Sequence, residues 1–452
     1  MTDLPTAVDA LLPELVEDLK RLTAIPSIAF DGFDRQPIQD AYDLIVDLLR
    51  GAGVQQIDRL DLPDTSPIIT ATVPGPPGAP TVLLYAHYDV QPAGDLAAWR
   101  TDPFTPTEVD GAIYGRGVAD DKSNLIAHLG ALRALGGRPP VTLKIVFEGQ
   151  EEWGSPLDSY PPHHPELFAC DAMVIADMGN LEPGRPTFTT ALRGDTEVMV
   201  SLRTLPEPKH SGEYGGVAPD ALIALVHALA TLHDDQGDVA VAGLRDDTWS
   251  GAAPITEDHF RTMIGVPPGT PLFGRGTVAD RLWSGPAITV VGMDVPATEG
   301  AVLAVNPYAK ALINVRVHPR QSAREAQDAV VAHLEAVRPF GFELTVERSD
   351  TGDGFEATTT GVAYAAAREA LAIAWKTEPI MIGSGGAIPL VSGLHEAVPD
   401  AEILLFGAED MQCNLHAPNE RVIIDEIRRT VIAMVEFFER YAVAYADEQA
   451  GR

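Results

Sequence analysis

Cysteine is scarce in this chain, whose 452 residues include only Cys170 and Cys413. Two cysteines are too few for a scaffold built on disulfides, and their scarcity favours a reducing compartment, so we expect a cytoplasmic protein. The first residues are acidic where a secretory signal is basic. No apolar run approaches the roughly 18 residues that a membrane span needs. The sequence therefore predicts neither secretion nor a membrane anchor.

Basic residues are also scarce, because 32 Lys and Arg stand against 65 Asp and Glu, for a formal net charge of -33. A field of this sign repels phosphate backbones and anionic lipid headgroups, so we expect no nucleic acid partner and no membrane partner. Most of the excess acids are expected on the solvated surface, because carboxylates are rarely buried unpaired. The charge is compatible with bound cations.

Short apolar runs that alternate with helical patterns indicate an α/β fold. The length allows two or three domains. The predicted buried strands span residues 81–86, 141–147, 172–176 and 402–406. The predicted helices span residues 8–22, 38–49, 123–135, 363–374 and 421–445. Strands that are apolar on both faces and alternate with helices predict a mostly parallel sheet with helices on both faces.

The middle third of the chain has a different pattern. Strands are predicted at residues 196–203, 287–291, 310–317 and 342–347, and helices at 219–232 and 322–337. The order β-α-β-β-α-β predicts a split-βαβ, ferredoxin-like α+β domain. We therefore expect a catalytic domain of residues 1–191 and 353–452, interrupted by an inserted domain of residues 192–352.

Side chains that can bind metal follow each of the four predicted buried strands. They are His87 and Asp89, Glu151 and Glu152, Asp177, and His416, and the turn before the third helix adds Asp120 and Asp121. Singly, each has an ordinary explanation, such as a helix cap or a solvated loop acid. Together, at the carboxyl edge of one sheet, they would repel each other strongly without cations. Mixed His and carboxylate ligands predict two divalent ions, zinc, manganese or cobalt in preference to calcium, that share one acid.

Seven motifs carry a resemblance to a known family. They are HYDVQP at His87, YGRGVADDKS at Tyr114, EGQEEWGS at Glu148, IADMGN at Ile175, KHSGEYGG at Lys209, GSGGAIP at Gly383 and NLHAPNE at Asn414. In this order they resemble the dinuclear zinc metallopeptidases, a group that includes aminoacylase, carnosinase-type dipeptidases, acetylornithine deacetylase and succinyl-diaminopimelate desuccinylase. The carnosinase-like dipeptidase branch is the most similar. The resemblance implies that the inserted domain is a lid and dimerisation domain.

The resemblance also implies a role for each metal ligand. His87 and Asp177 are expected to hold one ion, Glu152 and His416 the other, and Asp120 to bridge them. Zinc is the favoured ion, with manganese or cobalt as alternatives.

The catalytic residues are implied in the same way. Glu151 is expected to act as general base and acid, and Asp89 to orient the imidazole of His87. A cis peptide bond is expected between Asp120 and Asp121.

For the lid, the resemblance implies one residue for the oxyanion and several for the substrate. His210 is expected to reach the active site of a partner subunit and stabilise the oxyanion. Arg316 is expected to pair with the terminal carboxylate of the substrate, assisted by backbone amides at Ser384, Gly385 and Gly386. From the residues alone, an ordinary strand arginine in an ion pair explains Arg316 nearly as well.

A homodimer through the lid is a further expectation from the family. The helix within residues 218–227 is expected at the interface, and the strand 196–203 is expected to extend a sheet across the two subunits.

The leading hypothesis is a metal-dependent hydrolase that cleaves the amide bond of dipeptides or short peptides. An N-acyl-amino acid deacylase or a succinyl-diaminopimelate desuccinylase is the alternative with the same chemistry. A catalytically inactive relative that only binds peptides is disfavoured, because Glu151 and all five expected ligands are present.

Overall fold

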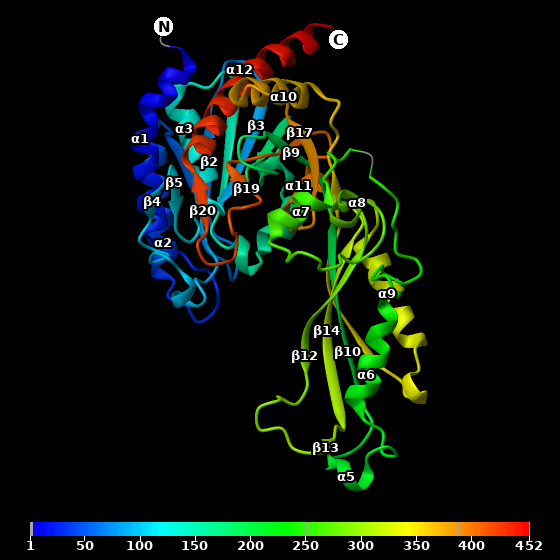
Figure 1. Ribbon diagram of the computed structural model, residues 1–452. Helices are drawn as coiled ribbons and strands as arrows, with labels where there is room; N and C mark the ends of the chain where they lie inside the picture. The colour runs from blue at the N-terminus through cyan, green and yellow to red at the C-terminus, as the bar shows by residue number, and fades with distance from the viewer. Residues whose placement is uncertain (1–2, 250, 387, 452) are drawn as a thin grey trace. The chain divides into compact units, whose positions relative to one another are not determined.

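The chain forms two compact units in a computed structural model that describes residues 3–249, 251–386 and 388–451 (Figure 1). Unit 1 comprises Met1–Thr190, Ala357–Ile382 and Gly393–Arg452, and unit 2 comprises Ala191–Glu356 and Gly383–Ser392. Each unit has its own hydrophobic core. Unit 1 is thus built from segments on both sides of unit 2 in the sequence.

Four parallel strands form the centre of the sheet of unit 1, in the order β6-β3-β7-β18. They are β3 (Thr81–His87), β6 (Thr142–Glu148), β7 (Ala172–Ile175) and β18 (Glu402–Leu405). Nearly all their residues are buried, because both faces of the sheet are covered, and this explains their continuous apolar runs. These are the four predicted strands, so the prediction of a largely parallel central sheet is confirmed.

Strands with antiparallel pairing flank this centre. On the β6 side lie β2 (Ile68–Val73) and then β1 (Gln56–Leu60). On the β18 side lie β9 (Thr187–Leu192) and then β16 (Phe355–Glu356), and β17 (Ile380–Ser384) also pairs with β9. The parallel strands are therefore not exposed at a sheet edge.

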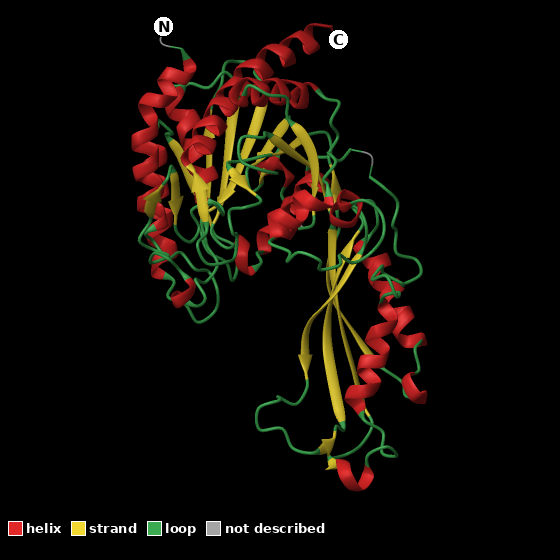
Figure 2. Cartoon of the chain, viewed as in Figure 1, coloured by secondary structure: helices red, strands yellow, loops and turns green. Residues whose placement is uncertain are grey.

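Helices lie on both faces of this sheet (Figure 2). The helices that pack into the main core are α1 (Leu4–Thr23), α2 (Gln36–Gly51), α3 (Lys122–Ala134), α10 (Val362–Trp375) and α12 (Ile424–Gly451). On the opposite face lies the short α4 (Pro165–Phe168), where the Lys144 ammonium of β6 donates to the carbonyls of Glu166 and Leu167 at 3.1 Å. Helix α11 (Pro389–Ala397) follows β17 in the chain.

The predicted helix 421–445 is wrong at its beginning. Arg421–Ile423 forms the strand β20, which pairs antiparallel with β5 (Ala112–Tyr114), and α12 begins only at Ile424. The β-branched run at residues 422–424 fits a strand as well as a helix, and pairing with a distant strand decides between them. Strand β4 (Thr107–Val109) completes this small sheet.

Unit 2 contains an antiparallel sheet in the order β12-β14-β10-β15. Its strands are β10 (Gly194–Arg203), β12 (Ala287–Asp294), β14 (Tyr308–Val317) and β15 (Thr345–Gly352). Helices α6 (Ala221–Leu229) and α9 (Ala323–Ala336) pack against it, and the alternating burial of β10 and β14 reflects one covered face. The order of elements is the predicted β-α-β-β-α-β. Helices α7 (Glu257–Ile264) and α8 (Val278–Trp283) lie in the long segment before β12.

The expectation that strand 196–203 extends a sheet across a dimer is wrong. This strand is β10, and it lies inside the sheet with β14 on one side and β15 on the other. Its backbone groups are already paired, so it has no free edge to offer. The edges of this sheet are β12 and β15.

Among the described residues, no helix is both long and apolar enough to cross a membrane.

The start of α10 depends on a carboxylate from β18. Gly361 stands at the N-cap and has no side chain to cap the helix. Instead, Glu402 accepts hydrogen bonds from the N–H groups of Ala363 at 2.9 Å and Tyr364 at 2.8 Å.

We predict that Glu402→Gln lowers the free energy of unfolding by about 1–2 kcal/mol, because the helix loses one acceptor and a negative charge at its N-terminus. Chemical denaturation measures this change. Glu396→Gln, on the exposed surface of α11, is the matched control and should leave the midpoint unchanged. Equal midpoints for the two variants would contradict the prediction.

Candidate metal centre

Five of the predicted site residues follow neighbouring parallel strands of unit 1. His87 is the last residue of β3, and Glu151 and Glu152 form a 3₁₀ turn shortly after β6. Asp177 follows β7, and His416 lies in the loop between β18 and β20. Because the strands are adjacent and run in the same direction, their carboxyl ends bring these side chains to one edge of the sheet.

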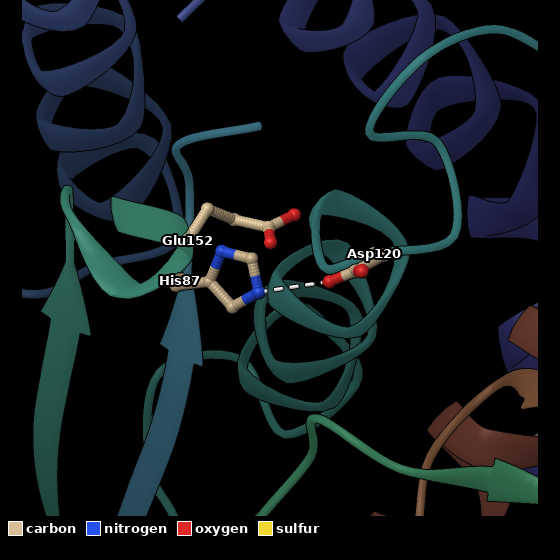
Figure 3. Close-up of side chains that lie close together, drawn as sticks. All are labelled: His87, Asp120 and Glu152. Atoms are coloured by element: carbon tan, nitrogen blue, oxygen red, sulfur yellow. Dashed lines mark hydrogen bonds and ion pairs between the residues drawn. The ribbon is translucent and has the colours of Figure 1, made fainter. Parts of the chain in front are cut away.

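Asp120 comes from the turn before α3 and contacts both histidines. Its Oδ1 lies 2.9 Å from Nε2 of His87 (Figure 3), and its Oδ2 lies 3.0 Å from Nε2 of His416. The peptide bond between Asp120 and Asp121 is cis, as the resemblance implied. One carboxylate therefore offers one oxygen to each of two imidazoles.

Each histidine has a second acid beside it. Nε2 of His87 lies 3.8 Å from Oδ1 of Asp177, and Nε2 of His416 lies 3.1 Å from Oε2 of Glu152. Ligand atoms of His87, Asp120 and Glu152 all lie within 4.8 Å of one another, and the same is true of His87, Glu151 and Asp177. These two groups share His87, and Asp120 contacts both histidines.

Within the described ranges, no lysine or arginine forms an ion pair with the four acids of this centre. The ammonium of Lys122 donates instead to the carbonyls of Leu22 and Ile25, each at 2.9 Å. Arg116 pairs with Glu420. Because buried carboxylates without a countercharge are strongly unfavourable, this donor set fits divalent cations.

The ionisation of these groups reflects the same lack of positive charge. Burial raises the pKa of Glu151 well above its usual range and also raises the pKa of Glu152 and of Asp177. Burial opposes ionisation of Asp120 too, but hydrogen bonds with the two histidines outweigh it and lower its pKa. Hydrogen bonds with Asp120 and Glu152 raise the pKa of His416 to about 10. Metal binding here would therefore displace protons from the histidines.

Asp89 is fully buried behind this centre and holds three of its members. Its Oδ1 and Oδ2 accept hydrogen bonds from the N–H groups of Glu151 and Glu152, both at 3.0 Å. Oδ1 also lies 3.4 Å from Nδ1 of His87. Asp89 therefore contacts both the imidazole and the turn that carries the two glutamates.

Gln91 contacts the centre and is not among the predicted site residues. Its Nε2 donates to Oε2 of Glu152 at 2.7 Å. Gln91 belongs to the HYDVQP motif, and this membership could have identified it as a residue of the site.

A further group of three acids, two of them buried, was not predicted as a group. Ligand atoms of Asp121, Asp177 and Glu409 lie within 4.8 Å of one another. Nδ2 of Asn124 donates to Asp121 at 2.7 Å and to Glu409 at 3.0 Å. Glu409 lies in β19 (Glu409–Asp410), which pairs with β8 (Gly179–Asn180) just after Asp177. No motif marks Glu409, because its position depends on this pairing between distant segments.

His210 lies in unit 2 at the end of β11 (Lys209–His210), which pairs with β13 (Ala304–Val305). Its Nδ1 accepts hydrogen bonds from the N–H groups of Gly212 at 3.1 Å and Glu213 at 3.3 Å, at the start of α5 (Ser211–Tyr214). A neutral imidazole that accepts at Nδ1 carries its proton on Nε2. His210 is thus prepared to donate a hydrogen bond from Nε2.

The predicted substrate-binding residues also lie in unit 2. Nη1 of Arg316 lies 3.3 Å from Oδ1 of Asp195, so this arginine has the ion pair that its alternative interpretation required. Ser384 ends β17, and its hydroxyl oxygen accepts from the N–H of Gly386 at 3.1 Å. Gly385 lies between them in the chain.

Comparison with known proteins gives the family of this chain. The model of peptidase family M20/M25/M40 matches residues 83–440. A cysteinylglycine-S-conjugate dipeptidase of Corynebacterium striatum is 40% identical over 372 residues, which cover 80% of this chain and 81% of the relative. A beta-Ala-His dipeptidase of Rattus norvegicus is 29% identical over 449 residues, which cover 92% and 90%.

A solved structure agrees with these matches. The crystal structure of human carnosine dipeptidase 1 superposes with a TM-score of 0.83 at 26% identity, and the match covers 97% of this chain and 98% of that one. The resemblance to dinuclear metallopeptidases of the carnosinase-type branch, which the seven motifs indicated, is thus confirmed. The chain belongs to peptidase family M20/M25/M40.

Proposed function

We propose that this chain hydrolyses the amide bond of dipeptides or short peptides at two divalent metal ions bound in unit 1. The observation that carries the proposal is the position of Asp120, whose two oxygens face two different histidines. A carboxylate placed in this way is suited to bridge two ions. The relatives described above are named as dipeptidases, which favours a dipeptide over an N-acyl amino acid or N-succinyl-diaminopimelate.

The distances support the expected division of the ligands. His87 and Asp177 are proposed to hold one ion, Glu152 and His416 the other, and Asp120 to bridge them. We propose zinc as the ion, with manganese or cobalt as alternatives that accept the same ligands. When bound, such ions polarise the scissile carbonyl and make a water molecule more acidic.

Glu151 is proposed to move the proton of the reaction. Its carboxylate forms no hydrogen bond or ion pair with any described residue, while its N–H is held by Asp89. The free carboxylate takes a proton from the attacking water and returns it to the leaving amine. Glu152, the next residue, is held by Gln91 and His416 and is therefore suited to bind metal.

Unit 2 is proposed as the lid that binds the rest of the substrate. His210 can donate from Nε2 to the developing oxyanion, in the active site of a partner subunit. Arg316 and the backbone amides at Ser384, Gly385 and Gly386 are proposed to bind the terminal carboxylate of the substrate. Asp195 holds the Arg316 guanidinium in place without blocking all of its donors.

We further propose a homodimer through unit 2. The edge strand β12 is exposed from Thr289 to Asp294, and Val290, Val291 and Met293 are among its exposed side chains. An exposed edge strand with apolar side chains is suited to cover by a second chain. A cytoplasmic location is proposed as well, because both cysteines are free thiols.

Glu151→Gln is predicted to lower kcat by roughly 10²–10⁴-fold while both metal ions stay bound, because the variant loses the proton-transfer group but no ligand. Glu152→Gln, one residue away in the same turn, is the matched comparison and should lose one ion. Steady-state kinetics and elemental metal analysis of the two variants measure these effects. Unchanged turnover in Glu151→Gln would refute its assigned role.

A panel of substrates tests the choice of substrate class. Apo-protein refilled with zinc, manganese or cobalt should release amino acids from unblocked dipeptides at least about tenfold faster than from N-acetyl or N-succinyl amino acids. Protein treated with a chelator and not refilled should be inactive. A preference for the acylated substrates would replace the dipeptidase proposal by the deacylase alternative.

Multi-angle light scattering at micromolar concentration should show a dimer of the 48.2 kDa chain. Val291→Lys, at a side chain that is 53% exposed on β12, should shift the protein toward monomer. Val443→Lys, at a side chain that is 64% exposed on α12 of unit 1, is the control and should remain dimeric. A monomeric wild-type protein under active conditions would exclude the action of His210 in a partner subunit.

A further inference from the structure

Glu420 is a fully buried carboxylate that binds the loop leading to Asp120. Its Oε2 accepts hydrogen bonds from Nη1 of Arg116 at 2.7 Å and from the N–H of Gly117 at 2.9 Å. Its Oε1 accepts from the N–H groups of Ala119 at 2.9 Å and Asp120 at 3.2 Å. One side chain thus holds three backbone N–H donors of the loop and a buried guanidinium.

Arg116 and the backbone of Glu420 tie the same loop to the segment that carries His416. Nη2 of Arg116 donates to the carbonyl of Ala417 at 3.3 Å, one residue after His416. The N–H of Gly115 donates to the carbonyl of Glu420 at 3.0 Å. The two loops are therefore joined by side-chain and backbone contacts close to both metal ligands.

Each of the two loops adjoins one strand of a pair, and the loops also meet at the metal centre: the Asp120 loop follows β5 and the His416 loop precedes β20. Tyr114 of β5 pairs with Arg421 of β20, and at the far end Oδ2 of Asp120 lies 3.0 Å from Nε2 of His416. His416 has a φ of 57°, a left-handed conformation that residues other than glycine rarely adopt. Such a conformation persists only where the surrounding contacts fix it.

We propose that Glu420 and Arg116 are positioning residues that set the spacing between Asp120 and His416. They thereby set the affinity for the ion that these two residues hold with Glu152. This inference rests on the two-ion function proposed above. A buried ion pair that served the fold alone would change the stability of the protein but not the affinity of one particular ion.

Calorimetric titration of apo-protein with zinc tests the proposal. The wild-type protein should show two binding events, and Glu420→Gln should weaken one of them by roughly 10–100-fold, because an amide cannot accept from all four donors. Arg116→Lys should weaken the same event to a smaller extent, since an ammonium cannot hold both Glu420 and Ala417 in a fixed fork. Glu402→Gln, at a half-buried helix cap at the opposite end of the strands, is the control for lost stability and should keep both affinities.

Wild-type affinities for both ions in Glu420→Gln and Arg116→Lys would overturn the proposal, as would an equal loss in Glu402→Gln. If Glu420→Gln does not fold, Arg116→Lys is judged by the same criterion. Fewer than two ions in the wild-type protein would instead overturn the two-ion function, and with it the role of Glu420.

Discussion

Several buried and half-buried carboxylates lie together around Asp120, and among the residues that the structure describes no lysine or arginine forms an ion pair with them. The local structure of unit 1 follows from this constraint. An uncompensated buried charge costs several kcal/mol, so these acids are stable together only with protons or with cations. Two histidines lie among them, and hydrogen bonds with the neighbouring carboxylates raise the pKa of both imidazoles, which favours their protonated forms where no metal is bound. Divalent ions can replace those protons with a stronger positive charge.

The fold engages two nearby cationic side chains, Lys122 and Arg116, in contacts outside this centre. Lys122 lies two residues after Asp120 and is fully buried, yet its ammonium is used by the carbonyls of Leu22 and Ile25. Arg116 is used by Glu420 in the same way. Both side chains thus stabilise the loops around the centre without occupying the place of a metal ion. A buried lysine among the ligands would have neutralised the acids permanently and left no site for a metal.

The sequence predicts most of unit 1 because its central strands have a strong local signal. Buried parallel strands are apolar throughout, and residue types that can bind metal stand at or directly after their ends, so His87 and Asp177 could be selected as candidate ligands from the sequence alone. This local signal is not sufficient where the structure of a segment depends on pairing with a strand that is distant in the sequence. Alternating polarity shows that β10 has one covered face, but it does not distinguish an interior strand from an edge strand. The residues 421–423 fit either regular structure, and only their partner β5 decides.

The residues that support the metal centre are harder to predict from the sequence, because their roles also depend on contacts between distant segments. Glu420 stands in the quoted motif NLHAPNE, but its role lies in contacts with a loop about three hundred residues earlier. Nothing in the neighbouring sequence distinguishes Glu420 from a glutamate on the surface. Composition and spacing identify groups that bind an ion directly, whereas groups that position those ligands are defined by the tertiary structure.

Unit 1 is built from segments that lie far apart in the sequence, so metal binding would also affect its stability. Four of the five proposed ligands precede unit 2 in the sequence and His416 follows it, so that Asp120 and His416 are separated by 296 residues. The later segment also supplies β18 at the centre of the sheet and α12 in the core. Ions shared by Asp120 and His416 would therefore join the two segments directly, and their binding free energy would add to the folding free energy of unit 1. The contacts of Glu420 and Arg116 join the same two segments without metal. The two segments of unit 1 that are distant in the sequence are thus joined at the place where the proposed ions would bind.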